Sequence, residues 1–107
     1  TYENTLYVAD RFNHRVQKFI RGSLNGTTVA GQANSTPCSS YQCLRSPSSI
    51  VLDNNENLFI SDAYNHRVVL WKKDATIGEL AAGTGMPFLF LCVNSFHAYS
   101  VRSGKWQ

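Results

Sequence analysis

The sequence predicts an all-β fold built from a repeated antiparallel unit, and two observations carry this prediction. The stretch that starts at Leu6 and reads Leu-Tyr-Val-Ala-Asp-Arg-Phe-Asn-His-Arg-Val returns at Leu58 as Leu-Phe-Ile-Ser-Asp-Ala-Tyr-Asn-His-Arg-Val, an offset of 58 − 6 = 52 residues. Apolar residues alternate with polar ones over short runs, and no run shows the 3.6-residue periodicity of a helix. A repeat of this period indicates a unit that buries its apolar face by stacking on copies of itself.

The first unit contains three predicted strands, at residues 5–9, 15–20 and 27–30. The polar residues 10–14, with one embedded aromatic, are predicted to form the turn between the first two strands. Asn25 and Gly26 form the dipeptide most typical of a tight hairpin, because both residues tolerate positive φ. The third strand is predicted to follow this hairpin and to end at Gly31.

The second unit contains four predicted strands, at residues 47–52, 58–61, 67–72 and 79–82. A polar loop rich in Ser, Thr and Asn, residues 33–46, leads into it. The polar run 53–57 is predicted to be the turn between its first two strands.

Four short antiparallel strands per repeat describe one blade of a β-propeller. Large apolar residues recur at matched positions, and we expect them on one face, where blade meets blade: Val8 with Ile60, Val16 with Val68, and Phe19 with Trp71. Because the chain holds only a little over two units, the sequence predicts an incomplete propeller.

The repeated turn resembles the NHL repeat, named for an Asn-His-Leu-type triplet. The resemblance rests on Asp-x-x-Asn-His-Arg-Val after a strand, present twice, and on Leu44-x-x-Pro47-x-x-Ile50-x-Leu52-Asp53, which looks like the start of an NHL blade. The glycine typical before the isoleucine is Ser49 here. The resemblance implies a ring of roughly six blades. The 52-residue spacing exceeds the about 40–45 residues of a blade, and the loop before the second unit accounts for the excess.

This resemblance divides the chain into four segments. Residues 1–32 are expected to form a partial NHL blade, and residues 33–46 an inserted loop that contains two cysteines. Residues 47–85 are expected to form the next NHL blade. Residues 86–107 are either a degenerate further blade or an unrelated tail; within them, residues 87–93 have the length and composition of a strand.

Charge and hydropathy exclude some classes of function. The net charge is +3, with ten Lys or Arg against seven Asp or Glu, and the basic residues are scattered. Such a balance permits a nucleic-acid partner but does not favour one. No apolar run reaches the roughly 18 residues of a membrane helix. A protein partner is therefore expected.

The inserted loop holds Cys38 and Cys43, which either form a local disulfide or are two unrelated thiols. A Cys-x-x-x-x-Cys pair also resembles half a zinc site, but no second ligand pair follows at zinc-finger spacing. Two glycosylation triplets, at Asn25 and Asn34, agree with secretion. Together, the cysteine pair and the triplets favour an extracellular location.

The most polar residues of the chain are the two copies of the repeated turn: Asp10, Asn13, His14 and Arg15, and Asp62, Asn65, His66 and Arg67. A catalytic or metal-binding histidine with an acidic helper is one interpretation. A structural role is the better one, because a catalytic group need occur once whereas a fold-forming turn occurs in every blade. The sequence thus predicts no catalytic residue, no metal and no cofactor.

Loops on a rigid scaffold remain as the candidates for function. Phe12 and Tyr64 occupy matched positions in the two turns, and Tyr41 lies between the two cysteines; all three are candidate partner contacts. The sequence therefore predicts a non-catalytic scaffold that binds protein through propeller loops. The alternative is the substrate- or RNA-recruiting propeller of a tripartite-motif-type ubiquitin ligase, whose catalytic RING would lie outside this chain.

Overall fold

The computed structural model describes residues 5–83, 99–102 and 105–106. Apart from two single 3₁₀ turns, every regular element in these ranges is a β-strand, which confirms the all-β prediction. The elements are β1 (Thr5–Asp10), η1 (Arg11–Asn13), β2 (Arg15–Phe19), β3 (Thr27–Gly31), β4 (Pro47–Leu52), β5 (Leu58–Asp62), η2 (Ala63–Asn65), β6 (Arg67–Trp71), β7 (Glu79–Gly83), β8 (Tyr99–Arg102) and β9 (Lys105–Trp106).

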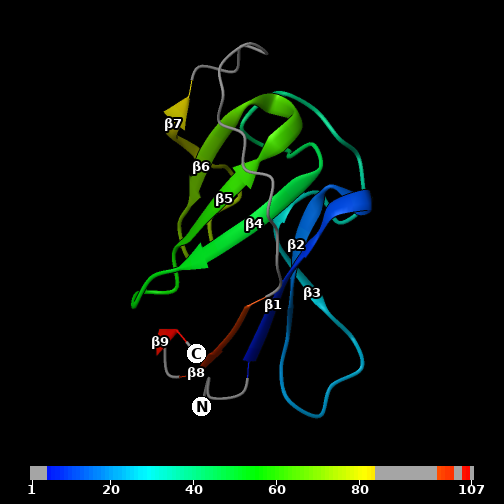
Figure 1. Ribbon diagram of the computed structural model, residues 1–107. Helices are drawn as coiled ribbons and strands as arrows, with labels where there is room; N and C mark the ends of the chain where they lie inside the picture. Colours follow the sequence, from blue (N-terminus) through cyan, green and yellow to red (C-terminus); the bar gives the residue numbers. More distant parts are fainter. Residues whose placement is uncertain (1–4, 84–98, 103–104, 107) are drawn as a thin grey trace.

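The second unit forms the predicted four-stranded antiparallel blade. Its strands follow one another in the order β4-β5-β6-β7, and every neighbouring pair is antiparallel. Short turns suffice for these connections because antiparallel neighbours begin where the previous strand ends. This sheet is coloured green to yellow in Figure 1.

The first unit supplies three strands of the other sheet, whose order is β3-β2-β1-β8-β9. β8 pairs antiparallel with β1, so it takes the place beside β1 that β4 takes beside β5. Two strands from the end of the chain thus extend the first sheet rather than forming a sheet of their own (Figure 1). The strand expected at residues 87–93 lies outside the described residues.

The two units share their register as well as their sequence. Leu6 pairs with Phe19 in the first sheet, and Leu58 pairs with Trp71 in the second, at the same 52-residue offset. β3 pairs with β2 through a bulge between Val16 and Gln17, and β7 pairs with β6 through a bulge between Val68 and Val69. The two bulges are 52 residues apart, as the repeats are. Equal register in the two sheets means that matched side chains point to matched faces.

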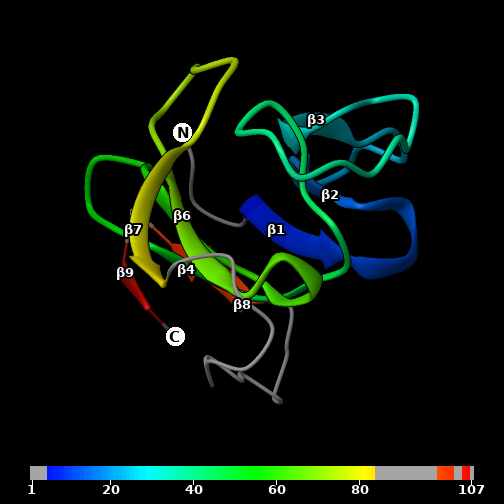
Figure 2. The ribbon, with the colours of Figure 1, turned by 90° about the horizontal axis from the view of Figure 1, so that it is seen from above.

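The two sheets pack face to face, as Figures 1 and 2 show from two directions, and one buried cluster fills the space between them. The first sheet contributes Tyr7, Val16 and Ala30, and the second contributes mainly Ile50, Leu52, Leu58, Ile60, Val69 and Trp71. Each of these side chains is at most 5% exposed, and burying one of the larger residues contributes about 1.5–3 kcal/mol.

The prediction that all three matched apolar pairs share one face is wrong. Val8 lies opposite Gln17, and Leu6 opposite Phe19, whereas Val16 lies opposite Ala9. Because residues directly opposite each other in a sheet point to the same side, Val16 faces away from Val8 and Phe19. Each blade therefore uses one face for the blade before it and the other face for the blade after it.

Comparison of matched residues shows that the ring is open. Val16 is fully buried and Ala30 is 1% exposed, because the second sheet covers them. Their copies, Val68 and Ala82, are half-buried and exposed. The outer faces of the two sheets, marked by Leu6 on the first and by Phe59 on the second, therefore remain uncovered within the described residues. This confirms an incomplete propeller.

β2 and β3 form the predicted hairpin, but its tight turn does not lie at Asn25 and Gly26. Positive φ occurs at Gly22, not at Asn25 or Gly26, and the Ser23 amide donates to the Ile20 carbonyl to close a turn earlier in the connection. Gly26 serves a different need, because a Cβ there would lie 2.7 Å from the Phe19 ring. A larger residue at position 26 would therefore require the Phe19 ring to shift.

Candidate functional site at the repeated turns

The strand directions place the polar turns and the inserted loop at one end of the two sheets. β1 and β5 run toward η1 and η2, and β3 ends where the loop 32–46 begins. We call residues 10–15, 32–46 and 62–67 the turn end. The connections 20–26, 53–57 and 72–78 lie at the opposite end of the strands.

In the second copy, three side chains of the repeated turn form one buried cluster. The Arg67 guanidinium donates from Nε to Asp62 Oδ2 at 2.8 Å, and Asn65 Nδ2 donates to the same oxygen at 2.9 Å. The Asp62 side chain is fully buried, and that of Arg67 is 6% exposed. A buried carboxylate requires such charge-assisted partners because water no longer solvates it.

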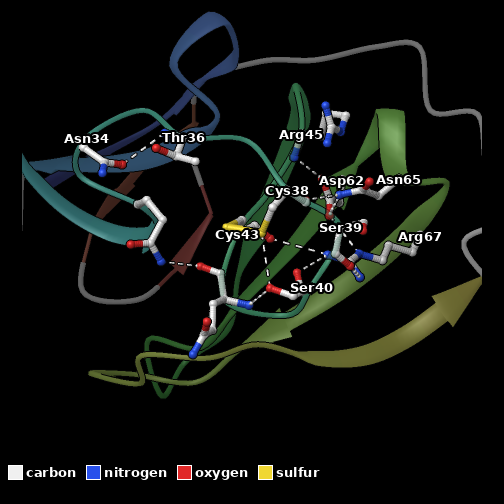
Figure 3. The surroundings of a disulfide bond; sticks show 12 residues. Asn34, Thr36, Cys38, Ser39, Ser40, Cys43, Arg45, Asp62, Asn65 and Arg67 are labelled. Carbon is white, nitrogen blue, oxygen red and sulfur yellow. Dashed lines mark hydrogen bonds and ion pairs between the residues drawn. A yellow bond between two sulfur atoms is a disulfide. The ribbon is translucent and has the colours of Figure 1, made fainter.

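Arg67 also holds the inserted loop, which the sequence did not indicate. Its Nη1 donates to the Ser39 carbonyl and its Nη2 to the Ser40 carbonyl, both at 2.9 Å (Figure 3). Its guanidinium lies 4.4 Å from the centre of the Tyr41 ring. A planar guanidinium with several donors can bind a carboxylate and main-chain carbonyls at once, which a lysine could not do with the same geometry.

The other polar groups of this turn fix the loop from both sides. Asn65 Nδ2 also donates to the Cys38 carbonyl at 2.9 Å, and the Arg45 amide donates to Asp62 Oδ1 at 2.6 Å. The Tyr64 amide in turn donates to the Arg45 carbonyl at 3.1 Å. The turn and the loop before it therefore form a single hydrogen-bonded unit.

Cys38 and Cys43 are joined in a disulfide, with their Cα atoms 5.2 Å apart (Figure 3). Cys43 is buried and Cys38 half-buried. The bridge closes the same segment whose carbonyls Arg67 and Asn65 hold. Covalent and hydrogen-bonded restraints thus act on one short loop.

The first copy of the turn has the same geometry but less around it. Arg15 Nε donates to Asp10 Oδ2 at 2.9 Å, and Asn13 Nδ2 donates to Asp10 Oδ1 at 3.1 Å. The side chains of this ion pair are 22% and 27% exposed. Arg15 reaches one main-chain carbonyl, that of Ala33. Within the described residues, no disulfide-closed segment packs on this copy as residues 38–43 pack on the second copy.

The histidine of the turn has two roles that its sequence position did not reveal. His14 adopts a left-handed conformation, φ 55°, which ends η1, and His66 does the same after η2 with φ 53°. In addition, His14 Nδ1 accepts a hydrogen bond from the Ser46 amide at 2.9 Å. This bond links the first unit to the residue just before β4, so the histidine positions one blade against the next.

The candidate contact residues differ in how they are placed. Phe12 is 86% exposed and Tyr64 is 61% exposed, and both lie at the middle of their 3₁₀ turns. Tyr41 packs instead against the hydrophobic core and under Arg67, and its carbonyl accepts from the Gly78 amide at 2.8 Å. Tyr41 therefore anchors the loop, and a partner contact there stays a prediction.

At the opposite end, a polar cluster ties the two sheets together. Glu56 lies 3.9 Å from Lys18 of the first sheet and 3.5 Å from Lys73 in the connection between β6 and β7. Burial raises the pKa of Tyr7 to about 12, and the negative charge of Glu56 and its hydrogen bond with Tyr7 add to this rise. A cavity of about 40 Å³ lies among these groups, enough for one water molecule.

Both carboxylates at the turn end, Asp10 and Asp62, are held by arginine. Among the described residues, no group of three or more His, Cys, Asp or Glu side chains could hold a metal ion. The rings of Phe12 and Tyr64 are exposed at this end, whereas Arg11 and Arg45 are half-buried.

Residues 44–69 match the family model of the NHL repeat, a stretch that spans β4, β5, η2 and part of β6. A search of the curated proteins gave no match. Within the described residues, no helix is long and apolar enough to cross a membrane.

Proposed function

We propose that this chain is a non-catalytic part of an NHL propeller that binds a protein partner through the turn end. NHL repeats generally serve as scaffolds for protein interaction, and the repeat is present here over residues 44–69. The observation that carries the proposal is the placement of Phe12 and Tyr64. Both rings are exposed, although the turns that carry them are fixed.

Large exposed aromatics at matched positions need an explanation, because the polar residues around them already complete the turn. Removing the ring of Phe12 or Tyr64 would break no hydrogen bond of the fold. Aromatic side chains are typical of the residues that dominate binding energy at protein interfaces. Because each ring stands on a hydrogen-bonded turn, little conformational entropy is lost when a partner contacts it.

The proposal can be tested by site-specific crosslinking. The photoreactive residue p-benzoylphenylalanine replaces Phe12 or Tyr64 in turn, and Leu24 as a matched control. Leu24 is 95% exposed at the opposite end, so it measures what any exposed apolar residue captures. A partner should crosslink from positions 12 and 64 and not from position 24.

The partner identified by crosslinking must then be purified and shown to bind the wild-type chain directly. Phe12→Ala and Tyr64→Ala should each weaken that binding by about 1–2 kcal/mol, or roughly tenfold, whereas Leu24→Ala should leave it unchanged. Equal capture from all three positions, or binding that survives loss of both rings, would contradict the proposal.

A further inference from the structure

We propose that the partner segment received by the turn end is acidic. This inference rests on the proposed function and specifies the chemistry of its partner. It comes from the excess of positive charge at the turn end, together with the position of two arginines on or next to the turns that carry the exposed rings.

The turn end has an excess of positive charge. Its acidic residues are Asp10 and Asp62, and its basic residues are Arg11, Arg15, Arg45 and Arg67, which gives 4 − 2 = +2. Both carboxylates are already paired, with Arg15 and Arg67. Within the described residues, Arg11 and Arg45 have no carboxylate within 4.0 Å.

Three lysines at the opposite end are paired within the chain. Lys18, Lys72 and Lys73 each lie within 4.0 Å of Glu56 or Glu79. At the turn end both carboxylates are already held by arginine, and two further arginines are left without a carboxylate among the described residues. An incoming anionic segment would therefore be drawn to these two arginines.

Both turns that carry an exposed ring also have one of the two unpaired arginines. In the first copy, the Arg11 guanidinium lies 5.8 Å from the centre of the Phe12 ring. The second copy has Ala63 at the position matched to Arg11, so its turn lacks this cation. There the main chain of Arg45, from the inserted loop, is bonded to the turn, because the Tyr64 amide donates to the Arg45 carbonyl at 3.1 Å.

The guanidinium of Arg45 is free for this role. Its backbone amide binds Asp62, whereas its side chain points away from that carboxylate (Figure 3). A ring with a guanidinium against it, and a second ring on a turn bonded to Arg45, fit a segment that carries carboxylates and apolar groups together. Arginine is suited to this task because its fork can bind a carboxylate through two parallel hydrogen bonds.

A protein segment fits these observations better than a nucleic acid. Nucleic-acid affinity comes from many phosphate contacts made by lysine and arginine. Here two guanidinia are unpaired at the turn end, and the described lysines lie at the other end. The same aromatic rings could stack on bases, so a single-stranded RNA belongs in the test.

The experiment measures fluorescence anisotropy with three labelled 12-residue peptides of alternating Glu-Tyr, Ser-Tyr and Lys-Tyr, and with a 12-nucleotide oligouridylate. At low salt, the Glu-Tyr peptide should bind at least about tenfold more tightly than the Ser-Tyr peptide. Added salt should reduce this difference, because the contacts are exposed to solvent. Arg11→Glu and Arg45→Glu should each abolish most of the preference for the Glu-Tyr peptide over the Ser-Tyr peptide.

Arg21→Glu is the matched control, since Arg21 is exposed at the opposite end and changes the net charge equally. It should leave the preference for the acidic peptide intact. Arg11→Gln and Arg45→Gln provide milder variants, and circular dichroism must show that each variant keeps the strand content of the wild-type chain.

Three outcomes would overturn the inference: equal binding of the Glu-Tyr and Ser-Tyr peptides, tighter binding of the oligouridylate, or an equal effect of Arg21→Glu. If the acidic peptide fails but a crosslinked partner still depends on Phe12 and Tyr64, the proposed function stands and the acidic partner does not. If neither result is positive, both are wrong.

Discussion

Replacing Arg67 with alanine should destabilise the fold far more than the same change at Arg15, although the two residues are copies of one motif. Arg67 makes a 2.8 Å ion pair with a fully buried Asp62 and holds the carbonyls of Ser39 and Ser40. Arg15 makes a 2.9 Å pair whose side chains are 22% and 27% exposed. The comparison isolates the effect of burial and of the held loop.

The magnitude follows from what each substitution leaves behind. Breaking a buried pair costs about 3–5 kcal/mol, because the remaining charge loses its partner away from water. Asp62 would keep its bonds from Asn65 and from the Arg45 amide, so we place Arg67→Ala at the lower limit, about 3 kcal/mol. Arg15→Ala should cost about 0–1 kcal/mol, as solvent-exposed pairs do.

Urea unfolding followed by tryptophan fluorescence measures both values, because Trp71 is buried and lies in the core between the sheets. All variants are compared at one protein concentration. Arg67→Lys is the informative intermediate. It keeps the charge but not the planar set of donors, so it should recover only part of the loss.

Equal destabilisation by Arg67→Ala and Arg15→Ala would refute the reasoning, since the local motif alone would then decide the effect. Full recovery by Arg67→Lys would contradict the assignment of the loop carbonyls to the guanidinium. An unchanged unfolding midpoint together with lost binding to a partner would show that Arg67 is a functional residue.

Four further predictions follow from the same structure. Gly31→Ala should destabilise the chain by about 1–3 kcal/mol in a urea melt, because φ is +82° and a Cβ would lie 2.5 Å from a backbone oxygen; Gly22→Ala, at φ +85° but in open space, should cost less. Since the folded pKa of Tyr7 is about 12 against a usual value near 10, its contribution is complete below pH 10 and is lost between pH 10 and 12; Tyr7→Phe should flatten that part of a stability–pH profile. The disulfide should be found by mass spectrometry after thiol blocking, and replacing Cys38 and Cys43 with serine should cost about 2 kcal/mol without unfolding the chain; alkylation of both thiols in protein from its natural compartment would contradict it. Finally, the uncovered outer sheet faces should make the isolated chain self-associate, so sedimentation that shows a compact monomer with a sharp cooperative melt would count against an open ring.

The local parts of the fold could be predicted from the sequence because they depend on neighbours along the chain. Alternation of apolar and polar residues indicated the strands, and the repeated turn fixed the spacing between them. The pairing of Asp62 with Arg67 was also predictable, since the two residues stand directly opposite each other where two strands meet. The tight turn expected at Asn25 and Gly26 was wrong, because the connection between β2 and β3 turns earlier, where the Ser23 amide bonds to the Ile20 carbonyl and Gly22 has positive φ.

The candidate site also combines features that follow from the sequence with contacts that do not. The repeated unit, the register of its strands and the two matched aromatic positions could be derived from the sequence, because all of these follow from a motif copied at a constant offset. The contacts of Arg67 with the inserted loop, the anchoring of Tyr41 and the bond between the Tyr64 amide and the Arg45 carbonyl depend on how the chain packs in three dimensions. These contacts join residues 19 to 28 positions apart in the chain. The two copies of the motif make different contacts because the burial of each copy depends on the residues that pack against it.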